Sequence, residues 1–429
     1  MKRNFCNRYI KLPLKAILLS LLIIFVCASA FCGCVSAEDV TVGNWNDLKA
    51  ALEDQSGDKT VVELSGNIND TDGIGYNVDP SNIIVINKTK TLNLKGHTIN
   101  ISETTEASQG SFTINNRGNL TVTGNGKIEC NARIFIVENG TLILESGTFN
   151  NTRASENDGR TSMIRIVGLK EDTKSKYSVF TLGKDATLSN ANWAVGIFHS
   201  SNEGQGYGVV VDISGKILSM EGVVNSSGIS INGQLKPTSI NEKVPQIHIH
   251  DGAEINTPNG CSVYGAGYGN WTFDKECKIT GSEVLSIKSG NWTINGGKFE
   301  ATGEYCDPAI ANGDGTEPTG AAVSITHGGK TAYSYIGKVE LIIKDGTFIS
   351  KNQSALFEGK NNKPASKSAL SDNGITITGG EFITKNSSKL YPIHIMNLLN
   401  KPVNVNTGNN IQLYPNFNLT AANWTKADD

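Results

Sequence analysis

The chain has 429 residues, with 38 Lys and Arg against 41 Asp and Glu and a formal net charge of −3. Five of the basic residues and no acidic ones lie in residues 1–37, so the rest of the chain carries 33 basic and 41 acidic residues, or −8. This balance excludes the charge pattern of a typical nucleic-acid-binding protein, and we expect no nucleic-acid partner.

Residues 1–37 have the pattern of a secretory signal peptide. Basic residues precede an apolar run from Ala16 to Val35, and Val35-Ser36-Ala37 has the small-x-small form of a cleavage site. Left uncleaved, the run is long enough to span a membrane, and Phe31-Cys32-Gly33-Cys34 weakly imitates a lipoprotein cleavage box. We therefore expect a protein that is secreted or held at the cell surface, and that touches a membrane only through an uncleaved leader.

Residues 38–58 are expected to form an N-terminal cap with a short amphipathic helix. Asn44 can accept a hydrogen bond at the start of this helix, and Gly57 can end it. The apolar face of the helix consists of Trp45, Leu48, Ala51 and Leu52. A stack of strands needs such a cover, because open strand edges pair with other chains.

Residues 59–429 are dominated by a short repeated block with the pattern apolar, x, apolar, x, x, Gly, x, apolar. Apolar residues two positions apart place both side chains on one face of a strand, and the glycine lets the backbone turn sharply after it. The spacing is identical in residues 142–149, 292–299, 341–348 and 375–382, and looser copies occur elsewhere.

The distance between blocks predicts the architecture. Blocks begin at Ile229, Ile247, Trp271 and Trp292, which are 18, 24 and 21 residues apart. That spacing suits the coils of a solenoid, in which each coil buries its apolar face on its neighbours. Further short strands lie between the blocks, so that each coil has two or three strands. We predict an all-β chain that forms a right-handed, single-stranded parallel β-helix over residues 59–429.

The segment Lys90-Thr91-Leu92-Asn93-Leu94-Lys95-Gly96-His97-Thr98-Ile99 resembles an early rung of the pectin-lyase-like β-helix proteins of prokaryotic surfaces. The Gly-Gly-x-Phe and Gly-Thr-Phe endings at 296–299, 346–348 and 379–382 are similar to the repeats of that group. The resemblance implies that an activity would lie on the outer face of stacked strands. Lyases of this fold use carboxylates that hold calcium together with a basic residue, and hydrolases use a cluster of aspartates.

The outward-facing middle residues of the blocks do not form such a cluster. They are Asn93, Thr121, Ile143, Asp212, Ser230, His248, Thr272, Thr293, Ile342 and Thr376. Only Asp212 is acidic, and it has no acidic counterpart one block later. The Gly-His-Gly pattern of the hydrolases is missing too, so we expect no catalytic residue on this face and no cofactor.

His248, His250 and Asp251 are the candidate metal ligands. Ile247 and Ile249 face inward, so both histidines project outward on the same side, with Asp251 just beyond them. Such a group can bind a transition metal. The alternative is an exposed strand on which polar residues simply alternate with apolar ones.

Tyr264, Tyr268 and Trp271 are the candidate carbohydrate-binding residues. The glycines from Gly265 to Gly269 suggest a nucleotide loop, but no helix pattern follows them, and Trp271 begins a strand. We expect a turn with exposed tyrosines, and the three aromatic rings can together stack on a sugar ring.

Cys261 and Cys277 are 16 residues apart, close to one coil, and can form a disulfide between adjacent rungs. The alternative is two unpaired, buried cysteines that pack as small apolar residues. There is no Cys-x-x-Cys pair, which disfavours a zinc site of that type.

Asn270, Asn291 and Asn423 each begin an Asn-Trp-Thr sequence, the acceptor pattern for N-linked glycans. If the host has the glycosylation machinery, exposed sites of this kind are modified on an exported protein, which would make the chain a glycoprotein.

Two classes of function fit these observations. The first is a non-catalytic exported β-helix, a monomeric adhesin-like rod that either displays loops or binds carbohydrate, in which case its partner is a polysaccharide or a cell-surface glycan. The second is a polysaccharide lyase or a related carbohydrate-active enzyme on the same fold.

Overall fold

A computed structural model describes the greater part of the chain between residues 39 and 414. The described residues are 39–56, 60–69, 83–101, 110–131, 133–152, 162–168, 177–190, 193–199, 208–220, 223, 226–231, 244–304, 319–327, 339–360, 370–385, 390–395, 403–405 and 411–414. Residues 39–429 form one compact unit. The expected leader, residues 1–37, lies outside the described residues. Among the residues that the structure describes, no helix is long and apolar enough to cross a membrane.

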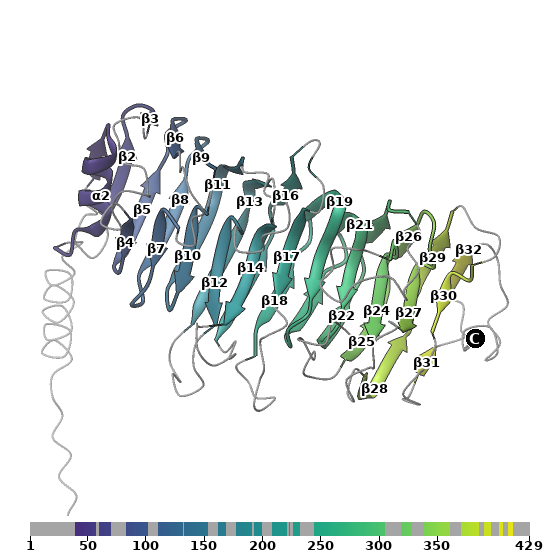
Figure 1. Cartoon of the computed structure of the whole chain (residues 1–429). Helices are drawn as coiled ribbons and strands as arrows, with labels where there is room; N and C mark the ends of the chain where they lie inside the picture. The colour runs from purple at the N-terminus through teal and green to yellow at the C-terminus, as the bar shows by residue number, and fades with distance from the viewer. Residues whose placement is uncertain are drawn as a thin grey trace, which may run out of the picture. The chain divides into compact units, whose positions relative to one another are not determined.

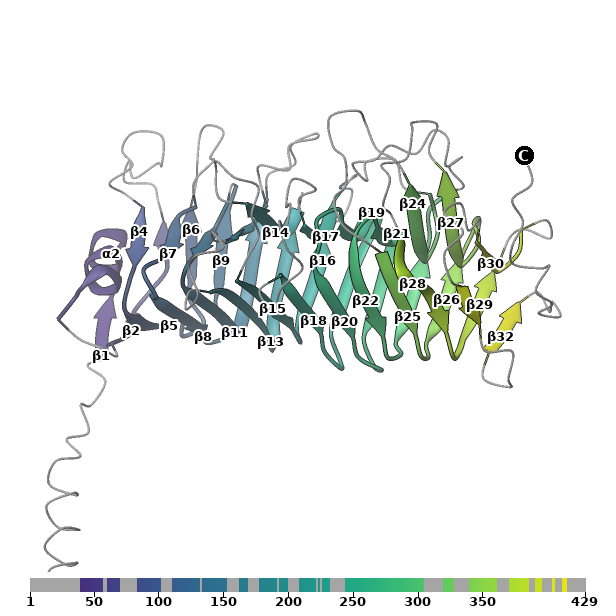
Figure 2. The same ribbon diagram turned by 90° about the horizontal axis from the view of Figure 1, so that it is seen from below.

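The strands of this unit pair in parallel and form three ladders (Figures 1 and 2). Within each ladder a strand pairs with the strands of the preceding and following coils, and the strands at the two ends of the ladder pair with one neighbour. The first ladder contains β1 (Asp39–Val42), β2 (Thr60–Leu64), β5 (Thr89–Asn93), β8 (Asn119–Thr123), the first parts of β11 (Thr141–Asn151) and β13 (Ser178–Asn190), β15 (Val209–Ile213), β18 (Gln246–Ile249), β20 (Asn270–Phe273), β22 (Gly290–Ile294), β25 (Val339–Ile343), β28 (Leu370–Ile377) and β31 (Val403–Val405).

The second ladder follows the first along the chain in every coil. It contains β3 (Ile68–Asn69), β6 (Thr98–Ile101), β9 (Lys127–Cys130), the second parts of β11 and β13, β16 (Lys216–Ser219), the first parts of β19 (Glu254–Gly265) and β21 (Lys278–Ile287), β23 (Lys298–Ala301), β26 (Thr347–Ser350), β29 (Gly380–Thr384) and β32 (Ile411–Tyr414).

The third ladder completes each coil before the chain returns to the first. It contains β4 (Ile84–Ile86), β7 (Phe112–Ile114), β10 (Phe135–Glu138), β12 (Ile164–Gly168), β14 (Trp193–His199), β17 (Ser227–Ile231), the second parts of β19 and β21, β24 (Val323–His327), β27 (Leu356–Lys360) and β30 (Ile393–His394). The prediction of an all-β chain built from parallel strands is confirmed.

The predicted helix is present as α2 (Trp45–Glu53), beside β2 and β4 at one end of the strand stack (Figure 1). Asn44 caps it, because its Oδ1 accepts a hydrogen bond from the amide of Asp47 at 2.9 Å. Trp45, Leu48 and Leu52 are buried, and the ring of Trp45 lies 5.8 Å from that of Phe112. Ala51 is partly buried against the same core, so the whole predicted apolar face is used.

The glycine of the repeated block lies at the corner between the first and second ladders. In the four blocks of identical spacing this residue has a positive φ, the backbone region that favours glycine. The values are +108° at Gly147, +103° at Gly297, +127° at Gly346 and +115° at Gly380. The sharp turn that the sequence predicts is therefore a backbone requirement in these coils.

The parallel register places equivalent core side chains above one another. The indole rings of Trp271 and Trp292, which are partners in β20 and β22, stack with centroids 4.5 Å apart and planes 7° apart. Phe348 stacks on Phe299 at 5.0 Å and on Phe382 at 4.8 Å. These separations match the spacing of neighbouring strands, so the backbone ladder sets the geometry of the aromatic column.

A lysine occupies an inward row of the first ladder, next to a buried threonine. Lys90 is 1% exposed and lies in register between Thr60 and Leu120. Its Nζ donates a hydrogen bond to Thr60 Oγ1 at 2.9 Å. Burial lowers the pKa of the Lys90 amine, and the charge of Asp54 partly opposes that shift.

Gly346→Ala is expected to destabilise the protein. At φ +127° a side chain is strained, and a new Cβ would lie 3.1 Å from the carbonyl oxygen of Gly297, so we expect a cost of about 1–3 kcal/mol. Thermal unfolding followed by circular dichroism should show a lower Tm. Gly66→Ala is the matched control, since no atom lies within 4 Å of its Cβ position and its φ is not positive. Equal effects of the two substitutions would contradict the role of the corner.

Lys90→Met is expected to stabilise the protein at neutral pH by about 1 kcal/mol, because it removes a buried charge. A lysine with a lowered pKa in the folded state destabilises the fold fully below that pKa. The penalty disappears as the pH rises through the ordinary lysine value of 10.5. The difference in Tm between variant and wild type should therefore shrink towards pH 11. Lys275→Met, at an exposed position, is the control, and a lower Tm for Lys90→Met at pH 7 would refute the expectation.

Candidate functional site

The outer face of the first ladder carries a continuous row of half-buried side chains. In register along the ladder these are Thr91, Thr121, Ile143, Thr181, Asp212, His248, Thr272, Thr293, Ile342 and Thr376. Most of the predicted outward residues thus share one row. Two do not: Ser230 is buried and pairs with Tyr264 in the third ladder, and Asn93 pairs with Thr123, two positions further along.

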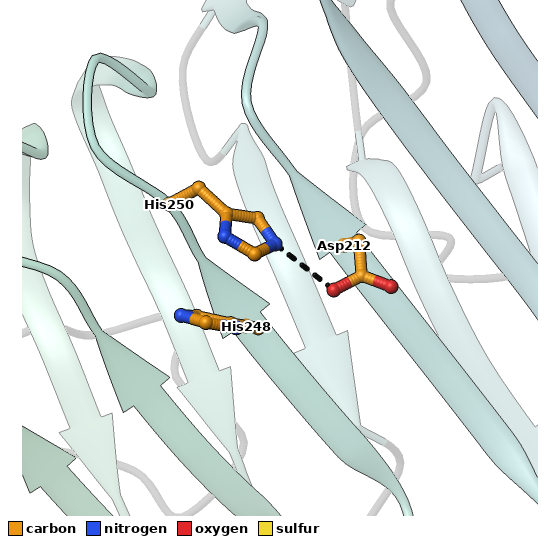
Figure 3. Close-up of side chains that lie close together, drawn as sticks. All are labelled: Asp212, His248 and His250. Atoms are coloured by element: carbon orange, nitrogen blue, oxygen red, sulfur yellow. Dashed lines mark hydrogen bonds and ion pairs between the residues drawn. The ribbon is translucent and has the colours of Figure 1, made fainter.

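His248 and His250 lie side by side on this face, as their alternation with isoleucines predicts. His248 belongs to β18 and His250 directly follows it. Their ring centroids are 3.7 Å apart, with 36° between the planes (Figure 3). Successive outward positions of a strand are wide apart at the backbone, so the two rings lean toward one another.

Two aspartates from neighbouring strands complete the cluster. Asp212 of β15 is the register partner of His248. Asp274 directly follows β20, and its amide donates to the carbonyl of Ile249 at 2.9 Å, which places it in the coil next to His250. Three consecutive strands of one ladder therefore supply the four side chains, which we call the His-Asp cluster: Asp212, His248, His250 and Asp274.

The contacts within the His-Asp cluster are short. His250 Nε2 and Asp212 Oδ1 are hydrogen-bonded at 3.0 Å (Figure 3). Oδ2 of Asp274 lies 2.9 Å from His248 Nε2 and 3.6 Å from His250 Nδ1. The contact to His248 is close but poorly aligned, so within the described residues its shielded Nε2 has no hydrogen-bond partner. The imidazoles are 37% and 33% exposed, and a small ligand can therefore reach them.

Asp251 does not belong to this cluster. Its Oδ1 accepts a hydrogen bond from the amide of Glu276 at 2.8 Å, in the turn after the strand. The expectation that Asp251 accompanies the histidines is not supported, since Asp212 and Asp274 hold that place. Asp274 directly follows β20, just as His250 directly follows β18, and the two residues are 24 positions apart, which is the spacing of their two blocks. This equal position in the two blocks was a sequence signal that Asp274 lies next to His250. The register of Asp212 was hidden by the longer connection that separates β15 from β18.

The tyrosines and the tryptophan proposed to stack on a sugar are buried. Tyr264 is 7% exposed, Tyr268 3% and Trp271 1%. Trp271 belongs to the core column, and Tyr264 packs with Cys261 and Ala266 in a separate small cluster. The expectation of exposed tyrosines is wrong, because the aromatic faces are used for packing and leave no platform for a sugar ring.

Tyr268 also has a structural role. Its hydroxyl accepts a hydrogen bond from Nδ2 of Asn291 at 3.0 Å, and burial raises the pKa of its phenol. Asn291 Nδ2 also lies 2.8 Å from Asn270 Oδ1, and Asn270 in turn donates to Gln246 Oε1 at 3.2 Å. These three side chains form an amide ladder across β18, β20 and β22.

The amide ladder bears on the glycosylation prediction. A glycan on Asn270 or Asn291 would attach to the Nδ2 atom that now donates these hydrogen bonds. A glycosylated Nδ2 keeps one hydrogen, so modification of Asn291, whose Nδ2 donates to both Tyr268 and Asn270, would remove one of its two hydrogen bonds. Glycosylation of Asn270 and Asn291 stays a prediction. Asn423 lies outside the described residues.

Of the two alternatives for Cys261 and Cys277, the structure has the unpaired, buried cysteines and not the disulfide. Both cysteines are free and buried. Cys277 lies in the main core, whereas Cys261 pairs with Glu283 and belongs to the separate cluster with Tyr264. Their spacing in the sequence is close to one coil, but the two side chains are buried in different hydrophobic clusters. Burial raises the pKa of Cys277 to about 12 and that of Cys261 well above its usual range.

Comparison of the chain with models of protein families, with curated protein sequences and with solved structures finds no match in any of the three. The function must therefore be argued from the chemistry of the surface itself.

Native Cys277 is expected to resist iodoacetamide at pH 8, because the thiolate reacts and burial raises the pKa of this thiol to about 12. After unfolding in guanidinium without reductant, Cys261 and Cys277 should both be alkylated, as measured by peptide mass spectrometry. A disulfide between them would leave both unlabelled until reductant is added, which would contradict the structure. Rapid labelling of Cys277 in the native protein would contradict its burial.

Proposed function

We propose that this protein is an exported, non-catalytic rod of the pectin-lyase-like type, adhesin-like, monomeric and carried to the cell surface or beyond. In this proposal the three parallel ladders are the three faces of a right-handed, single-stranded β-helix, with α2 as the cover of its first coil. The order in which the chain visits the ladders supports this path, because each coil adds one strand to every ladder. Export rests on the leader sequence.

The partner that we propose is a polysaccharide or a cell-surface glycan. The observation that carries this proposal is the outer row of the first ladder, in which six of the ten residues are threonines that carry a hydroxyl group: Thr91, Thr121, Thr181, Thr272, Thr293 and Thr376. Beside it runs the amide ladder of Gln246, Asn270 and Asn291. Hydroxyl and amide groups both donate and accept hydrogen bonds, as the hydroxyls of a sugar do. Such groups spread along many strands suit an extended polymer better than a compact ligand.

A glycan array probed with the purified protein tests this proposal. We expect binding to a restricted set of glycans, and a loss of about tenfold in affinity for the double variant Thr293→Glu and Thr376→Glu, equivalent to about 1.4 kcal/mol. Thr280→Glu, on the outer face of the second ladder, is the control and should bind as wild type does. Absence of binding to any glycan, or equal loss in the control, would refute the glycan-binding role.

A second candidate is a polysaccharide lyase or a related enzyme, which the His-Asp cluster favours. Carboxylates and imidazoles are the groups that most often transfer protons in catalysis. Incubation with uronate-containing polysaccharides and calcium, followed by ultraviolet absorbance of unsaturated products, distinguishes the two functions. We expect no turnover. Turnover that is lost in Asp212→Ala would refute the non-catalytic function and support the enzyme.

A further inference from the structure

The His-Asp cluster has the composition of a transition-metal site. Imidazole nitrogen and carboxylate oxygen together are the donors that suit Zn²⁺ and other first-row divalent ions. A ring nitrogen of each histidine and a carboxylate oxygen of Asp212 lie within 4.8 Å of one another. Zinc sites with ligands at about 2.0–2.2 Å place their donors about 3.0–3.5 Å apart. Small side-chain rotations on a fixed ladder bring the three groups to that distance.

The three donors are held on rigid elements. His248 and Asp212 are register partners in adjacent parallel strands, and His250 is fixed by its amide, which donates to the carbonyl of Ile213 at 2.8 Å. The inward neighbours Ile247 and Ile249 are 1% and 0% exposed. The backbone under the site is thus anchored by the core, and ion binding needs no change of fold.

Asp274 lies on the opposite side of the imidazoles from Asp212. His250 Nε2 is hydrogen-bonded to Asp212 Oδ1, and its Nδ1 lies 3.6 Å from Asp274 Oδ2, so Nε2 can meet an ion while a small rotation brings Nδ1 into hydrogen-bond distance of Asp274. Carboxylate–histidine–metal chains of this kind fix the tautomer and the orientation of the ring. Oδ2 of Asp274 also approaches His248, whose Nε2 lacks a hydrogen-bond partner within the described residues. Asp274 is therefore a positioning residue.

We propose that Asp212, His248 and His250 bind one divalent transition-metal ion of the Zn²⁺ class on the outer face of the first ladder, with Asp274 orienting the imidazoles. Three protein ligands leave coordination positions open to solvent or to a further ligand, since the side chains are about one-third exposed. The site is independent of the rod proposal, because a glycan-binding surface needs no metal.

Isothermal titration of the purified, chelator-treated protein with ZnCl₂ tests this inference. We expect one ion per chain in wild type, and loss of that binding in His248→Ala and in Asp212→Ala. Asp274→Asn should bind about tenfold more weakly, the usual effect of removing an orienting carboxylate. Asp251→Ala is the matched control: it removes a nearby carboxylate outside the cluster and should leave the affinity unchanged.

Substitution with Co²⁺ gives a second readout, because its visible spectrum reports the coordination number. An intense band in wild type that is absent in His250→Ala would place the ion at the imidazoles. Unchanged thermal unfolding of each variant without metal would show that the fold is intact. Absence of Zn²⁺ binding by wild type, or equal binding by His248→Ala, would overturn the site and leave a polar surface cluster. Neither result would bear on the glycan-binding proposal, which the glycan array tests separately.

Discussion

The constraint on which this structure depends is the parallel hydrogen-bond register between one coil and the next. It fixes which residue lies over which, so that a side chain in one strand is held about one strand spacing from its equivalent in the following coil. The Trp271–Trp292 pair and the column of Phe299, Phe348 and Phe382 are inward results of that constraint. The amide ladder and the His-Asp cluster are its outward results. The arrangement of side chains in the core and on the surface therefore follows from the same backbone pairing.

The same constraint explains why the interior was predictable from the sequence. An apolar pair followed by glycine and a further apolar residue repeats with identical spacing in four blocks, and the structure places these four across the first and second ladders as that pattern requires. The looser copy that begins at Ile229 lies in β17 of the third ladder instead. Gly297, Gly346 and Gly380 all have positive φ, and the phenylalanines that follow them stack. The helix was predictable too, because Asn44 and the apolar face of residues 45–52 carry a local signal that needs no knowledge of the rest of the chain.

The outer surface was less predictable, because the sequence gives no direct measure of which residue in one coil pairs with which residue in the next. Asp212 and His248 are 36 residues apart, although they lie in adjacent coils, because the coil between them is longer than the spacing of 21 to 24 residues seen from Ile247 to Trp292. Their pairing therefore cannot be read from the repeat spacing. Local patterns also mislead about exposure. Tyr264 and Tyr268 lie in a glycine-rich sequence typical of a surface loop, yet both are buried, and Tyr264 belongs to β19. Their environment is set by strands distant in sequence, as is the separation of Cys261 from Cys277.

The corner glycines also bear on how such a chain can change its length. The carbonyl of Gly297 lies against the corner at Gly346, and that of Gly346 lies against Gly380, so each bend rests on an identical one. Duplication or deletion of a complete coil would place like on like again and preserve every contact of this kind. A one-residue change of the interval shifts the register at the corner instead: Leu144 pairs with Leu182, but Ser146 pairs with Asp185, because β13 holds one residue more than β11 there. Whole repeats thus extend the stack without a register shift, whereas a change of length within a repeat requires an irregular corner.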